Sequence, residues 1–102
     1  AVDHRDGFAQ VDRDWLARIE NSQKNAPRDL RLQYLAGVAY LRQQLWGKAQ
    51  HTLEQLISNP QAEREHPELT RRAHVHLAQL AEYQGREADA QKSWRKAALL
   101  GA

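Results

Sequence analysis

Two stretches of the chain carry small residues at matching positions, and this pattern limits the folds that the chain can adopt. The stretches are residues 35–49 (LAGVAYLRQQLWGKA) and residues 77–90 (LAQLAEYQGREADA). The matching pairs are Gly37 with Ala78 and Ala49 with Ala90. Small residues at such places let two successive helices approach closely. The sequence therefore predicts an all-α fold with two helical hairpins that repeat one another.

Helical periodicity and helix-ending residues predict five helices in a single domain over residues 8–102. The expected parts are a disordered lead at 1–7, a leading helix at 8–24, repeat one at 29–58 (helices 30–43 and 46–58), a linker at 59–67, and repeat two at 68–100, whose helices run from about 67 to 84 and from 87 to 100. Asp29 is the expected N-cap of repeat one, Pro67 suits a first helical turn, and Gly85 suits a helix end. The leading helix would supply the missing half of a third repeat, and a homodimer is the alternative.

Composition excludes several classes of function. The chain has 15 basic and 13 acidic residues and a formal charge of +2, so it lacks the excess of basic residues typical of nucleic-acid binding. Without cysteine it can form neither a disulfide nor a thiolate metal site. The longest uncharged run, from Leu32 to Leu41, is about half of a membrane-spanning length. Because the sequence contains no Met, we expect a fragment of a longer protein.

The hairpin pattern resembles tetratricopeptide (TPR) repeats, and one segment resembles a particular family. Ala49 and Ala90 are 41 residues apart, against a TPR period of about 34, which places an insertion of about seven residues in the linker. Residues 44–57 (QLWGKAQHTLEQLI) resemble the carboxy-terminal repeats of HemY-type proteins, and residues 14–19 (DWLARI) and 73–98 are similar to the same family.

The HemY resemblance implies a function and a location. Members are bacterial inner-membrane TPR proteins associated with heme biosynthesis, with two amino-terminal membrane helices that are absent from this sequence. The resemblance implies a soluble TPR portion that faces the cytoplasm and a non-enzymatic role in organising or regulating heme-pathway enzymes. It supplies no catalytic residues.

In TPR proteins the first helix of each hairpin lines a concave groove that binds a peptide or an amphipathic helix. The residues expected on this face are Arg31, Tyr34, Val38, Leu41, Arg42, Arg72, Val75, Gln79 and Tyr83. Tyr and Arg are enriched at binding hot spots, which favours a protein partner. The alternatives are that Tyr34 and Val38 pack against the leading helix or that the face forms a dimer contact.

Two tryptophans lie at places with structural roles. Trp46 falls at the elbow of repeat one, directly before Gly47, where it would either wedge the two helices apart or contact a partner. Trp94 falls where such repeats carry a core aromatic residue, so we expect it to be buried.

No motif predicts catalysis, a metal site or a bound cofactor. His74 and His76 are two residues apart and would point about 200° away from each other on a helix, whereas zinc ligands on a helix lie three or four apart. Heme ligation by His51 or His74 is an alternative that rests on the family alone. The remaining rivals to protein binding are therefore a heme- or porphyrin-binding regulator and a self-assembling structural module.

Overall fold

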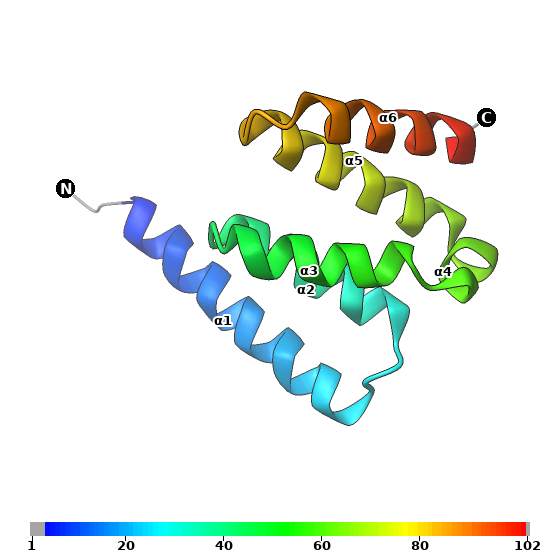
Figure 1. Cartoon of the computed structure of the whole chain (residues 1–102). Coiled ribbons are helices and arrows are strands. Elements are labelled where there is room, and N and C mark those ends of the chain that lie inside the picture. The colour runs from blue at the N-terminus through cyan, green and yellow to red at the C-terminus, as the bar shows by residue number, and fades with distance from the viewer. Residues whose placement is uncertain (1–3, 102) are drawn as a thin grey trace.

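The computed structural model describes residues 4–101, and the side chains of residues 13–101, as a set of helices joined by short turns (Figure 1). The helices are α1 (His4–Asn25), α2 (Leu30–Arg42), α3 (Trp46–Ile57), α4 (Pro60–Glu65), α5 (Pro67–Tyr83) and α6 (Glu87–Gly101). No strand occurs within residues 4–101, so the predicted all-α class is confirmed.

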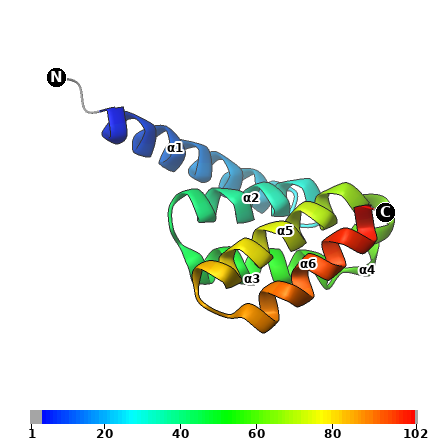
Figure 2. The same ribbon diagram turned by 90° about the horizontal axis from the view of Figure 1, so that it is seen from above.

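The helices follow one another in space as they do in sequence. Helices α2 and α3 form one hairpin, α5 and α6 form the next, and α5 also packs against α3. Helix α1 packs on α2, and the short α4 connects the two hairpins. Figures 1 and 2 both show α1 and α6 at opposite edges of the molecule, which measures 46 × 35 × 22 Å.

The elbows of the two hairpins have the same backbone geometry. In each hairpin, the second residue after the first helix is in the left-handed region: Gln44 (φ 59°) in one and Gly85 (φ 76°) in the other. The following N–H closes a Schellman-type bond to a carbonyl of the last turn. These bonds join Leu45 N–H to Tyr40 O (2.9 Å) and Arg86 N–H to Ala81 O (2.8 Å). The equivalent residues of the two elbows are 41 positions apart, which is also the spacing between Ala49 and Ala90. These pairs are Tyr40 and Ala81, Gln44 and Gly85, and Leu45 and Arg86.

The buried side chains form two clusters. The larger one lies between the hairpins and comprises Leu30, Leu53, Leu56, Ala62, Ala73 and Leu77. The smaller one lies between α1 and α2 and comprises Leu16, Ile19, Ala36 and Ala39. The polar Thr70 is fully buried, and its hydroxyl donates to the carbonyl of His66 (3.0 Å), so no unpaired polar group is left there.

Three expectations were wrong. The chain forms six helices within residues 4–101 rather than five, because residues 59–67, expected to be a linker, contain α4. The first helix begins at His4, so residues 4–7 are helical rather than a disordered lead, and residues 1–3 lie outside the described part. Trp94 is 38% exposed instead of buried, since its indole N–H donates to the exposed Glu82 carboxylate of α5, which keeps the ring at the surface.

Candidate functional site

A polar contact joins the first helices of the two hairpins. The Tyr34 hydroxyl of α2 and Nε2 of His76 on α5 are 3.1 Å apart, and the ring centres are 5.8 Å apart. Burial lowers the pKa of His76 below its usual value, and the positive charge of Arg72 lowers it further. The imidazole is therefore neutral near pH 7, and one ring nitrogen can accept the tyrosine hydrogen.

Beside this contact lies a depression of about 580 Å³ between the beginnings of α2 and α5. Its lining residues, which define the α2–α5 depression, are Arg31, Tyr34, Leu35, Glu65, His66, Pro67, Glu68, Leu69 and Arg72. The structure thus brings together three residues of the predicted groove: Arg31, Tyr34 and Arg72. The Arg72 guanidinium pairs with Glu68 (3.2 Å), whereas the exposed Arg31 makes no ion pair with a described side chain.

The other residues of the predicted groove lie outside the α2–α5 depression. Leu41 is half-buried and packs against the larger core cluster, as Tyr34 also does. The Arg42 guanidinium lies 6.0 Å from the centre of the Trp15 ring of α1. Val38 and Val75 are half-buried, and Gln79 is exposed.

Tyr83 and Trp46 lie against each other, and together they connect the two hairpin elbows. Tyr83, at the end of α5, is 75% exposed, and its ring centre is 5.4 Å from that of the half-buried Trp46 at the start of α3. The contact spans the two hairpins rather than the two helices of repeat one. Trp46 therefore packs between repeats, with part of its surface still open to solvent.

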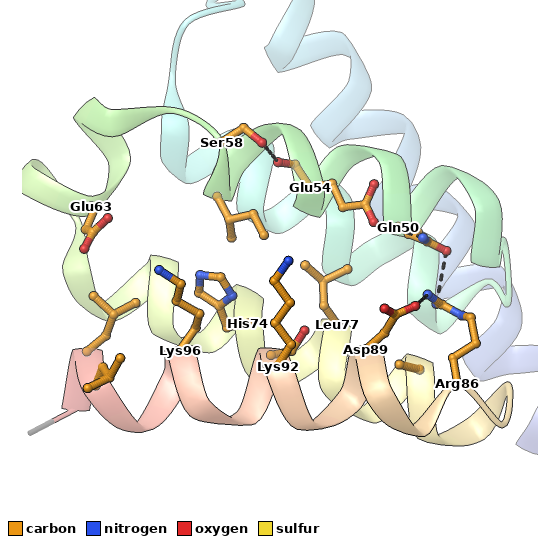
Figure 3. Close-up of a pocket in the computed structure, with 15 residues that line it drawn as sticks. Gln50, Glu54, Ser58, Glu63, His74, Leu77, Arg86, Asp89, Lys92 and Lys96 are labelled. Atoms are coloured by element: carbon orange, nitrogen blue, oxygen red, sulfur yellow. Dashed lines mark hydrogen bonds and ion pairs between the residues drawn. The ribbon is translucent and has the colours of Figure 1, made fainter.

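A second cavity, also of about 580 Å³, lies where no sequence pattern indicated a site (Figure 3). Helix α5 supplies its floor, α3 and α4 form one wall, and α6 with the residue before it forms the other. The residues that define this α3–α6 cleft are Gln50, Glu54, Ile57, Ser58, Glu63, His74, Leu77, Ala81, Arg86, Asp89, Lys92, Ser93, Lys96, Leu99 and Leu100. The cleft lies between the second helices of the hairpins, whereas the predicted groove lies on the first helices.

The α3–α6 cleft has a charged pair at one end and a histidine at its floor. Arg86 closes one end, where it pairs with Asp89 (3.0 Å) and donates to Gln50 across the cleft (3.4 Å). At the floor, burial lowers the pKa of His74, the charge of Lys96 adds to this effect, and the carboxylate of Glu63 opposes it. The histidine is therefore mostly neutral near pH 7.

The described residues of the two cavities do not form a metal site. Within the described residues, no group of three or more His, Cys, Asp or Glu side chains is placed to hold a metal ion. The two histidines considered for heme occupy different environments: His51 is exposed on α3, and His74 is half-buried in the cleft floor. No helix in the described part of the chain has the length and apolar character needed to cross a membrane. What the two cavities offer is apolar surface edged with charge, which is typical of macromolecular recognition.

Comparison of the chain with protein-family models, with curated proteins and with solved structures gave no match.

Proposed function

We propose that this chain is a non-enzymatic, TPR-like module that binds a segment of a partner protein across α2 and α5. Two features support the proposal: the hairpin elbows repeat one another, and the first helices of the hairpins lie close enough for Tyr34 and His76 to be hydrogen-bonded. Helical repeats use the corresponding face to bind extended peptides and amphipathic helices.

The α2–α5 depression is the observation that carries the proposal. It combines apolar surface from Tyr34, Leu35 and Leu69 with the exposed guanidinium of Arg31. An apolar side chain of the partner would enter the depression, and a neighbouring carboxylate would pair with Arg31. Burial of the apolar group would give most of the affinity, and the arginine would set orientation and association rate.

The resemblance to HemY-type proteins extends this proposal to a biological setting. The partners would be heme-pathway enzymes, and the parent protein would be anchored in a bacterial inner membrane with this module facing the cytoplasm. The residues of the α2–α5 depression would then recruit or regulate those enzymes without taking part in their chemistry.

Affinity capture from a detergent-solubilised bacterial extract tests the proposal. The baits are the wild-type chain, Arg31→Glu, and Arg95→Glu as a control with the same charge change at an exposed position of α6. We expect heme-pathway enzymes on wild type and Arg95→Glu and at least about tenfold less on Arg31→Glu, because the reversed charge repels the partner carboxylate. Equal capture on all three baits would refute the proposal.

A further inference from the structure

The two walls of the α3–α6 cleft carry opposite charges. The wall made by α3 and α4 contributes Glu54 and Glu63 and no basic residue, whereas Lys92 and Lys96 lie on α6. Arg86 and Asp89 neutralise each other at the end of the cleft. The side chains of Glu63, Lys92 and Lys96 point into the space between the helices (Figure 3).

Within the described residues, these four charged side chains have no partner of opposite charge. Lys92, Lys96 and Glu63 make no ion pair or hydrogen bond with a described side chain, and Glu54 only accepts from the neighbouring Gln50 (2.9 Å). All four side chains are exposed. They are therefore available to pair with another molecule that approaches the cleft.

Apolar surface accompanies the charges. Ile57 and Leu77 line the interior of the cleft, and Leu99 lines it while remaining 72% exposed. A single exposed leucine needs no explanation, but here Leu99 adjoins an apolar interior edged with charges, an arrangement like the apolar core and polar rim of a protein interface. The molecule that fits must bring an apolar side chain, an acidic edge for α6 and a basic edge for α3.

The chain itself presents each of these features. We propose that the α3–α6 cleft is a homodimer interface, in which the clefts of two copies face each other about a two-fold axis that runs along the cleft. Leu99 of each copy then contacts the apolar interior of the partner cleft. The formal charge of +2 leaves little long-range repulsion between two copies.

The charges favour a two-fold axis along the cleft over the other symmetric arrangement, in which the axis runs across the cleft. Rotation about an axis along the cleft places α6 of each copy opposite α3 of the other, so basic walls meet acidic walls. Rotation about an axis across the cleft would place α3 on α3 and α6 on α6, so like charges would meet. Only the first arrangement is electrostatically favourable.

The positions of the charges along the cleft agree with the same axis, because this rotation keeps each residue at its own level. Glu63 and Lys96 lie near His74, toward the end of the cleft away from Arg86 (Figure 3). Lys92 and Glu54 lie nearer the middle (Figure 3). In the dimer, Lys96 of each copy therefore faces Glu63 of the other, and Lys92 faces Glu54.

Sedimentation equilibrium of the purified chain over a range of concentrations tests this interface. We expect a monomer–dimer equilibrium that weakens as salt is added, since the paired charges lie near solvent. The double variants Lys92→Glu/Lys96→Glu and Glu54→Lys/Glu63→Lys should each raise the dimer dissociation constant about a hundredfold, because like charges then face each other. An equimolar mixture of the two variants should form a heterodimer, because all walls of one copy are acidic and all walls of the other are basic.

Controls separate this result from general charge effects and from the proposed function. Lys24→Glu/Arg95→Glu changes the net charge as Lys92→Glu/Lys96→Glu does, but at exposed positions outside the cleft, and should leave dimerisation unchanged. Circular dichroism checks that each variant keeps its helices. Arg31→Glu should still dimerise, so loss of partner capture and loss of the dimer are independent outcomes. A monomer at every concentration, or dimers that survive either cleft double variant, would overturn the proposal.

Discussion

At the scale of single residues, the contact between Gly37 and Leu53 leaves no room for a larger side chain. A Cβ on Gly37 would lie 2.5 Å from Cδ2 and 2.8 Å from Cγ of Leu53, which is fully buried. We expect Gly37→Ala to lower the free energy of unfolding by about 1–2 kcal/mol, because overpacking outweighs the helix-propensity gain of about 1 kcal/mol. Urea denaturation followed by circular dichroism measures this change.

Gly47→Ala is the control for this prediction. A Cβ there meets nothing within 4 Å, so the free energy of unfolding should stay equal or rise. Equal stability of the two variants would contradict the close approach of α2 and α3.

The half-buried His76 makes the free energy of unfolding depend on pH. Its pKa in the folded chain lies below the value of about 6.5 expected for the unfolded chain, through burial and the charge of Arg72. In the window between these two values the unfolded chain binds more protons. The contribution of His76 is therefore complete above about pH 6.5 and declines as the pH falls towards the folded pKa. His74, whose pKa is also lowered, acts in the same direction.

Substitution of His76 by Gln should make this pH dependence shallower. The amide can still bond to Tyr34, but it does not titrate. The measurement is the free energy of unfolding in urea at several values between about pH 8 and pH 5, spanning the ordinary histidine range. His51→Gln, at an exposed position, controls for the loss of one imidazole. A His76→Gln profile as steep as that of wild type would mean that other groups cause the acid sensitivity.

At the scale of elements, the two elbows differ in one residue that should affect their stability. Gln44 adopts a left-handed φ of 59°, whereas the equivalent position in the second hairpin is Gly85. A side chain is strained in this region, and glycine is not. We expect Gln44→Gly to raise the free energy of unfolding by about 0.5–1 kcal/mol and Gly85→Ala to lower it by about 1–2 kcal/mol. Thermal unfolding should therefore shift upward in the first variant and downward in the second. Shifts in the same direction would contradict the equivalence of the elbows.

Helix ends were predictable from the sequence where a residue acts through local geometry. The carboxylate of Asp29 accepts from the N–H of Arg31 (2.9 Å) and caps α2, and Gly85 ends α5, as predicted. Helix α4 was missed because Asn59-Pro60 can either stop one helix or start another. Here the Asn59 side-chain oxygen accepts from the N–H of Gln61 (2.9 Å) and caps α4, and Pro60 occupies the first turn. A helix of six residues is too short to show a periodic pattern.

At the scale of the whole molecule, the sequence predicted one candidate surface in part and did not predict the other. Arg31, Tyr34 and Arg72 meet at the α2–α5 depression because they occupy matching places on two helices that pack side by side. The α3–α6 cleft depends on how far apart two second helices stand, which a sequence does not encode locally. Lys92 and Lys96 on α6 resemble an ordinary solvated face, so only the arrangement of the helices reveals that they line a cavity.

The linear order of the helices predicts unequal stability along the molecule. Helix α1 packs on the outer side of α2 through a separate buried cluster, whereas α5 contacts α2, α3, α4 and α6. Native-state hydrogen exchange should therefore be fastest in α1 and slowest in α5.

Ile19→Ala removes a side chain that is 5% exposed and should lower the stability of the α1–α2 cluster by about 2–4 kcal/mol. It should reduce protection of α1 amides about 30-fold or more, while α5 amides keep wild-type protection. Leu77→Ala, in the larger cluster, is the matched change and should reduce protection in α3, α5 and α6 instead. If Ile19→Ala lowered protection equally in α1 and α5, the helices would unfold as one cooperative unit, because an opening confined to α1 exposes only the amides of that helix and its contact with α2.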